Sequence, residues 1–213
     1  MTAVATKITA TFWDCGGVLL TNGWDHVARR RVAEYFGLNF DEFEQRHEQP
    51  NDQWERGKIT LQEYLNQTVF YVPRQFSQED FIAQMRAVSQ VLYPQMVAFL
   101  RRLRLQRTPD GRPGMYLLSN ESRELMEYRI PQFGLTDLFD AFLVSSYIGL
   151  RKPEAAFYRC ALDISQRSPG ECVFVDDREE NVAAARQLGI CGICLETPQQ
   201  VIAELGQLGI TIA

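Results

Sequence analysis

Four short segments of the chain place acidic, basic and neutral hydrogen-bonding side chains at the ends of apolar runs or shortly after them. They are Asp14, Ser119 with Asn120, Lys152, and Asp176 with Asp177. If the fold gathers these segments, their three carboxylates repel one another unless cations neutralise them, and one lysine does not suffice. Oxygen ligands without His or Cys select a hard divalent ion, Mg2+ first. A metal, a lysine and hydroxyl and amide donors form the environment that a phosphate group needs, which makes Asp14 a candidate nucleophile.

The elements that must position these residues are apolar runs with the composition of buried strands. These runs cover residues 8–14, 115–119, 141–145, 172–177 and 191–195, and helical patterns separate them. The alternation predicts an α/β fold, a doubly wound parallel sheet with right-handed crossovers. Such sheets bind ligands at the carboxyl ends of their strands, so we expect the four segments to meet there. Gly16 and Gly17 let the backbone after Asp14 turn sharply and approach a ligand closely.

A helical insertion interrupts this pattern after the first strand. Helices are expected over 25–36, from 40 to about 55 with a break near Pro50, over 64–71, and over 77–88. A later helix, after Asn120, is expected to end near Arg129, before Pro131. We predict a core domain of residues 1–20 and 93–213 and an all-helical cap domain of residues 21–92. A cap in this position should overhang the strand ends, exclude water and contact the leaving group.

Composition narrows the function classes. The 213 residues carry a net charge of -5, which argues against a general nucleic-acid binder. No apolar run approaches the ~18 residues that a membrane span needs, and the first residues lack a signal-peptide pattern. Five cysteines without a disulfide framework favour the cytoplasm, and Cys191 and Cys194 are interpreted as part of a buried strand. A monomer or a homodimer is expected, and the sequence does not specify which.

The four segments also resemble the motifs of a known family. Asp14–Leu19, Leu118–Asn120, Gly149–Glu154 and Val173–Asp177 are similar, in order and spacing, to the four motifs of the haloacid dehalogenase-like (HAD) hydrolases. In texture they are most similar to the α-glucose-1-phosphatases and to the N-terminal phosphatase domain of soluble epoxide hydrolase. The resemblance covers essentially the whole chain and includes a helical cap directly after the first motif.

The resemblance implies a role for each matching residue. Asp14 would form an aspartyl-phosphate, Ser119 and Asn120 would hold the phosphoryl oxygens, and Lys152 would neutralise the phosphate and Asp14. Mg2+ would be held by Asp14, by the backbone carbonyl of Gly16 and by Asp177, with Asp176 orienting water or Lys152 and Asn181 supporting the water around the metal. Further candidates for contacts with phosphate or substrate are Gly17, Trp24 and His26.

One position departs from the family pattern. The family usually has an aspartate two residues after the nucleophile as general acid and base, and here that position is Gly16. Such catalysis is typically worth about 10²–10⁴-fold. The favoured explanation is a substrate with a good leaving group, such as an anomeric or acyl phosphate. Alternatively Asp25, His26 or Glu121 supplies the proton, or the protein binds a phosphorylated ligand with weak catalysis.

The leading functional hypothesis is a Mg2+-dependent phosphatase for a small phosphorylated metabolite such as a sugar 1-phosphate, with no nucleic-acid or membrane partner. A haloacid dehalogenase is the second enzymatic hypothesis. Asp176 and Asp177 argue against it, because two anions beside a metal-free Asp14 would repel both nucleophile and halide. A phosphate-binding protein without efficient turnover is the third.

Overall fold

A five-stranded parallel sheet forms the centre of the molecule. The computed structural model describes residues 7–106 and 111–212. The strands are β1 (Ala10–Trp13), β2 (Gly114–Ser119), β3 (Ala141–Val144), β4 (Cys172–Asp176) and β5 (Cys191–Cys194), in the spatial order β3-β2-β1-β4-β5. All four neighbouring pairs are parallel. The strand order reverses between β1 and β4, where open α/β sheets bind ligands. This arrangement confirms the predicted doubly wound α/β fold.

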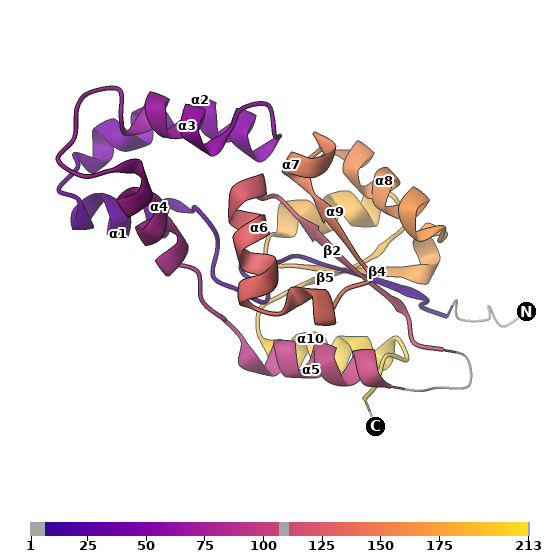
Figure 1. Ribbon diagram of the computed structural model, residues 1–213. Coiled ribbons are helices and arrows are strands. Elements are labelled where there is room, and N and C mark those ends of the chain that lie inside the picture. Colours follow the sequence, from indigo (N-terminus) through magenta and orange to yellow (C-terminus); the bar gives the residue numbers. More distant parts are fainter. Residues whose placement is uncertain (1–6, 107–110, 213) are drawn as a thin grey trace, which may run out of the picture.

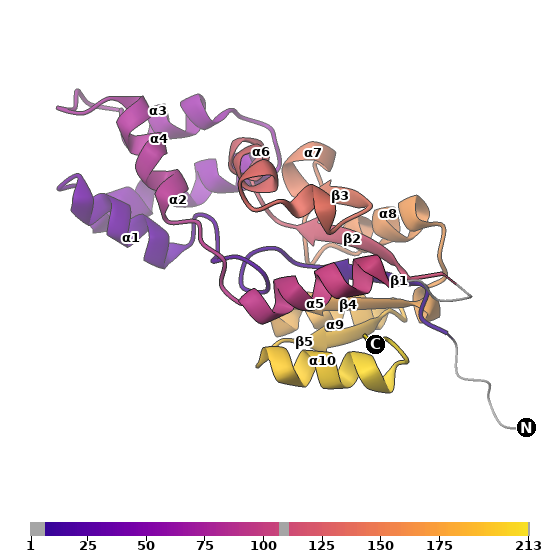
Figure 2. The ribbon, with the colours of Figure 1, turned by 60° about the horizontal axis from the view of Figure 1, so that its bottom comes forward.

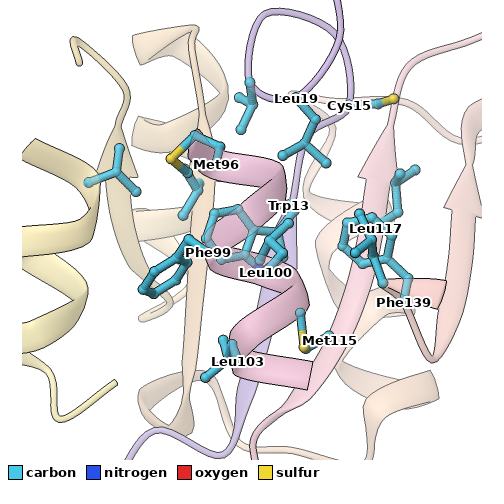
Figure 3. Close-up of a cluster of buried hydrophobic side chains, with 14 of the residues drawn as sticks. Trp13, Cys15, Leu19, Met96, Phe99, Leu100, Leu103, Met115, Leu117 and Phe139 are labelled. Atoms are coloured by element: carbon cyan, nitrogen blue, oxygen red, sulfur yellow. The ribbon is translucent and has the colours of Figure 1, made fainter. Parts of the chain in front are cut away.

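Helices cover both faces of the sheet (Figure 1). The helices α5 (Pro94–Leu105), α6 (Arg123–Gln132) and α10 (Pro198–Gln207) share one apolar cluster with Trp13 of β1. Figure 3 shows α5 laid across that face, with Phe99, Leu100 and Met115 beside Trp13. On the opposite face, α8 (Ala155–Ser165) and α9 (Glu179–Gln187) pack against Phe12. The side chains of the neighbouring residues Phe12 and Trp13 therefore pack into two separate cores, as expected for a strand that is buried on both sides.

Four helices of the insertion form a body of their own, beside the sheet in both Figure 1 and Figure 2. They are α1 (His26–Tyr35), α2 (Phe40–Glu55), α3 (Leu61–Thr68) and α4 (Gln78–Ala87). Their apolar faces converge on a cluster that includes Trp24, Trp54, Tyr64 and Phe81. Capping boxes start α3 at Thr60 and α4 at Ser77. Each box satisfies backbone donors that would otherwise be left unpaired at the helix start.

Two predicted helix limits were wrong, both at prolines. α2 runs through Pro50 without a break, because Pro50 lies on the same buried face as His47 and Trp54. Packing of that face outweighs the cost of about 3 kcal/mol for an interior proline. α6 continues through Pro131 to Gln132. Pro131 has no backbone N–H, so the last turn of the helix lacks only one backbone hydrogen bond. The short helices α7 (Ser145–Ile148), η1 (Leu135–Asp137) and η2 (Pro169–Glu171) were not predicted.

The two connections between the insertion and the sheet run together. Leu20 forms a β-bridge with Val91, and the Thr21 amide donates to the Gln90 carbonyl at 2.8 Å. Arg129 of α6 is fully buried between the connections, where it donates to the Thr21 carbonyl at 2.9 Å and to Ser89 Oγ at 3.1 Å. The chain thus enters and leaves the insertion at one place, where Arg129 hydrogen-bonds both connections.

Among the described residues, none of the helices has the length and apolar character required to cross a membrane.

Candidate active site

The carboxyl ends of the strands bring Asp14, Lys152 and Asp176 into direct contact. Asp14 follows β1, and its amide donates to the Val175 carbonyl at 2.9 Å, which fixes it beside β4. The Lys152 ammonium lies 2.8 Å from Asp14 Oδ1 and 2.7 Å from Asp176 Oδ2. Burial disfavours the charged form of Lys152, but the charges of Asp14 and Asp176 outweigh this effect and raise its pKa. The buried ammonium therefore stays charged and links the two carboxylates.

Asp176 orients its neighbours and is itself saturated with donors. Its Oδ1 accepts from the Arg178 amide at 2.8 Å and from Asn181 Nδ2 at 3.0 Å, while Oδ2 accepts from Lys152. Asp176 is fully buried. With every oxygen engaged, it holds Lys152 and Asn181 in place.

Asp177 completes a group of carboxylates suited to a cation. One oxygen each of Asp14, Asp176 and Asp177 lie within 4.8 Å of one another. Oδ1 of Asp177 is buried, and within 7–106 and 111–212 it has no hydrogen-bond partner. Burial and the charge of Asp176 raise the pKa of Asp177. An unpartnered buried oxygen beside two further carboxylates fits a hard divalent ion such as Mg2+.

The same cluster raises the pKa of Asp14. Burial is the main cause, opposed by Lys152 and reinforced by Asp176 and Asp177, and together they bring the pKa of Asp14 to about 7. A carboxylate attacks as a nucleophile only when it is ionised, so additional positive charge at this point favours the reactive form. The positive charges of the protein itself do not neutralise the three carboxylates, which is the deficit of positive charge predicted from the sequence.

The glycine turn after Asp14 makes room for Asp177. Gly17 adopts a φ of +76°, and a Cβ at this residue would lie 2.2 Å from Asp177 Oδ2. The Gly17 amide donates to the Leu20 carbonyl, which closes the turn. Gly17 therefore acts through Asp177 and does not line the cavity described below, whereas Gly16 does.

A small polar cavity of about 70 Å³ opens onto Asp14. Ser119, Asn120, Lys152 and Asn181 contribute to its walls. The Asn120 side chain also clamps the lysine loop, since its Nδ2 donates to the Lys152 carbonyl at 2.9 Å and its Oδ1 accepts from the Lys152 amide at 2.8 Å. The residue expected to hold phosphoryl oxygens thus has a positioning task as well.

Three residues singled out for their closeness to Asp14 in the sequence lie elsewhere. The Trp24 indole donates to the Tyr64 hydroxyl at 2.7 Å inside the cluster of the insertion. His26 is exposed, with its Nδ1 3.0 Å from Glu44. Asp25 caps α1 by accepting from the Ala28 amide. The chain turns away from the strand ends after Gly23, so Trp24, Asp25 and His26 do not line the cavity.

The end of α2, by contrast, lies at the cavity, and the sequence offered no signal for this. Glu55 lines the cavity, and its carbonyl accepts from Ser145 Oγ at 2.6 Å. Arg151 bonds Asp52 Oδ1 at 2.8 Å and lies 2.8 Å from Glu55 Oε2. These contacts join positions about a hundred residues apart, and only the folded chain reveals them.

Comparison with known proteins finds similarity to one family of hydrolases. The family profile "haloacid dehalogenase-like hydrolase" matches residues 8–189. A sesquiterpene phosphatase of Aspergillus oryzae is 30% identical over 214 residues, which is 96% of this chain and 98% of that protein. The bifunctional epoxide hydrolase 2 of rat is 24% identical over 169 residues, 74% of this chain and 30% of that protein. A HAD-family enzyme from Bacteroides thetaiotaomicron has a similar fold, with a TM-score of 0.76, 21% identity, and coverage of 90% of this chain and 95% of that chain.

Proposed function

The chain belongs to the haloacid dehalogenase-like hydrolases, and from this membership and the geometry of its strand ends we propose that it is a Mg2+-dependent phosphatase. The observation that carries the proposal is the buried cluster of Asp14, Lys152 and Asp176 with the unpartnered Asp177 oxygen beside it. The substrate is a small hydrophilic phosphomonoester such as a sugar 1-phosphate.

The residues of the chain divide the work as follows. The Asp14 carboxylate attacks phosphorus and forms an aspartyl-phosphate, which water then hydrolyses. Lys152 offsets the charge of the phosphoryl group, held in position by Asp176. Ser119 and Asn120 donate to phosphoryl oxygens from the cavity wall.

Mg2+ would be held by Asp14, Asp177 and the Gly16 carbonyl, with Asp176 and Asn181 next to it, and would supply positive charge to the phosphoryl oxygens.

The comparisons support this proposal at the level of reaction and cofactor. The Aspergillus relative is named a phosphatase, and the Bacteroides enzyme has been solved in complex with magnesium and inorganic phosphate. The lining of the cavity supports the hydrophilic substrate, because Asn22, Glu55, Arg151 and Arg178 surround the space beyond Asp14. A terpenyl group would strip water from these polar and charged side chains without replacing their hydrogen bonds.

We also propose that residues 21–92 form the cap over a core of 1–20 and 93–213. The separate aromatic cluster of the insertion and its paired connections support this division.

A panel of phosphomonoesters tests the proposal. Phosphate release from glucose 1-phosphate, glucose 6-phosphate and farnesyl phosphate is measured with Mg2+ and with EDTA, for the wild type and for Asp14→Asn. We expect release from the sugar phosphates that both EDTA and the substitution abolish. Chloride release from 2-chloropropionate that is indifferent to EDTA would replace the proposal with a dehalogenase. Tight binding of a sugar phosphate without turnover would replace it with a binding protein.

A further inference from the structure

The catalytic site lacks a side chain for proton transfer at Gly16, and the cavity offers two other acidic groups that could carry a proton. They are Glu55, from the end of α2, and Glu121, from the loop after β2. The inference drawn from them rests on the proposed phosphatase function.

Glu121 is committed to the framework of the protein. Its Oε1 accepts from the Ser122 amide at 2.9 Å, and its Oε2 accepts from the buried Arg129 at 3.0 Å. Arg129 in turn holds both connections of the insertion. Neither oxygen of Glu121 is therefore free to exchange a proton with a substrate.

Glu55 has the opposite arrangement. Its Oε1 accepts from Asn51 Nδ2 at 3.2 Å. Its Oε2 is buried and, among the residues that the structure describes, accepts no hydrogen bond. Arg151 Nη2 lies 2.8 Å from this oxygen as an ion-pair partner. Glu55 lines the cavity of the nucleophile, and its Oε2 has an ion-pair contact but, within the described ranges, no hydrogen bond. This carboxyl group, unlike that of Glu121, is therefore suited to exchange a proton at the cavity.

The surroundings of Glu55 act on its proton from several elements. Asp52 precedes it on α2, Arg151 comes from the loop before α8, Arg178 from the loop after β4, and Glu121 from the loop after β2. Burial is the largest influence and raises the pKa of Glu55, while the two arginines oppose it. A raised pKa brings a glutamic acid closer to the range in which it can both give and take a proton near neutral pH.

We infer that Glu55 is the general acid and base of this site, supplied by the insertion in place of the residue absent at Gly16. In the first half-reaction Asp14 bonds to phosphorus, the bond from phosphorus to the ester oxygen breaks, and that oxygen takes the Glu55 proton and leaves as an alcohol. In the second half-reaction a water molecule attacks phosphorus through its oxygen, and Glu55 takes a proton from that water. The bond from phosphorus to Asp14 breaks, which releases inorganic phosphate and restores both carboxyl groups.

Contacts between the end of α2 and the sheet domain hold Glu55 at the cavity. Ser145 Oγ donates to the Glu55 carbonyl, and the Trp54 indole donates to Glu124 Oε2 at 2.9 Å. Glu55 thus reaches the cavity only while the end of α2 rests on the sheet domain. Catalysis of phosphoesters with poor leaving groups depends on this contact.

The test compares Glu55→Gln with Asp52→Asn on two kinds of substrate. Asp52 is the matched control, because it lies on the same helix and bonds Arg151 but does not line the cavity. Glucose 6-phosphate has a leaving group that needs a proton, and p-nitrophenyl phosphate has one that does not. For Glu55→Gln, kcat/KM with glucose 6-phosphate should fall by about 10²-fold or more. Release of nitrophenol in the first turnover should change by less than about threefold.

A second readout separates chemistry from structure. Because Glu55→Gln also lacks the base for the second half-reaction, the phosphorylated protein should accumulate with p-nitrophenyl phosphate and be detected by intact-protein mass spectrometry. The fall of kcat/KM at alkaline pH with glucose 6-phosphate should disappear in this variant. Asp52→Asn should hydrolyse both substrates without accumulating phosphorylated protein. It should keep the fall at alkaline pH, displaced to lower pH because Asp52 contributes to the raised pKa of Glu55.

Equal losses on both substrates without accumulation of phosphoprotein, or no loss on either, would overturn the assignment of Glu55. These outcomes presuppose a wild type that hydrolyses phosphomonoesters in the presence of Mg2+. A wild type that releases no phosphate from any substrate would refute the proposed function instead.

Discussion

Mild acid should destabilise the helical insertion through one buried histidine, His47. Its Nδ1 lies 2.7 Å from the Tyr64 hydroxyl, which accepts from the Trp24 indole at 2.7 Å. Because an indole only donates, the Tyr64 oxygen accepts from Trp24 and its own hydrogen is left for His47 Nδ1, which accepts only when the imidazole is neutral. Burial, reinforced by the positive charge of Arg29 and opposed by Glu44, lowers the pKa of His47 to about 3.

The magnitude follows from this pKa and the ordinary value of 6.5. Between these two values the unfolded chain binds a proton at His47 and the folded protein does not, so the free energy of unfolding falls as the pH falls. Each pKa unit corresponds to about 1.4 kcal/mol, so lowering the pH from 7 to about 5 should cost about 2 kcal/mol at this site. The loss begins near pH 6.5 and continues to about pH 3.

Urea unfolding at about pH 7 and pH 5, followed by tryptophan fluorescence, measures this effect in the wild type and in His47→Gln. Trp24 and Trp54 lie in the same cluster as Tyr64 and report on the insertion. The variant keeps a polar side chain but does not titrate, so its loss between the two pH values should be smaller by about 2 kcal/mol. Comparing losses cancels any cost of the substitution that is independent of pH. Equal losses in the two proteins would refute the reasoning.

Two further predictions concern the turn at the nucleophile and the connections of the insertion. Gly17→Ala places a Cβ 2.2 Å from Asp177 Oδ2 at a φ of +76°, and Mg2+ binding measured by calorimetry should weaken by about tenfold or more. Gly134→Ala has a similar φ of +63° but its nearest neighbour is 3.7 Å away, so it should bind Mg2+ as the wild type does; equal weakening in both would contradict the role given to Asp177. Arg129→Met leaves the buried Glu121 unpaired and should lower the free energy of unfolding by about 3–5 kcal/mol in urea. A loss below about 1 kcal/mol would show that water or a rearranged loop replaces the arginine.

The sheet and its acidic edge could be predicted because they depend on local patterns. A continuous apolar run marks each buried strand, and parallel topology brings the strand-end residues Asp14 and Asp176 to one edge. Lys152 reaches that edge on the loop after α7, which Asn120 holds in place. The continuity of α2 through Pro50 could not be read in this way, because local preference favours a break and only the packing of the folded insertion opposes it.

The insertion was hardest to predict where it meets the site. Trp24 and His26 were chosen because they follow Asp14 closely in the sequence, but nearness along the chain does not survive the turn into α1. Glu55 lies much further along the chain and reaches the cavity through a helix whose orientation is set by contacts with Ser145 and Arg151. Such contacts join distant positions and leave no periodic trace in the sequence.

The pairing of Leu20 with Val91 has a consequence for how this architecture can change over time. The two points at which the insertion joins the sheet are already hydrogen-bonded neighbours, so excising everything between them would leave ends that a tight turn can bridge. Insertions of other lengths and shapes can replace the present one at the same junction without disturbing β1 or β2. Descendants of such a scaffold can acquire new selectivity while their reaction chemistry stays constant.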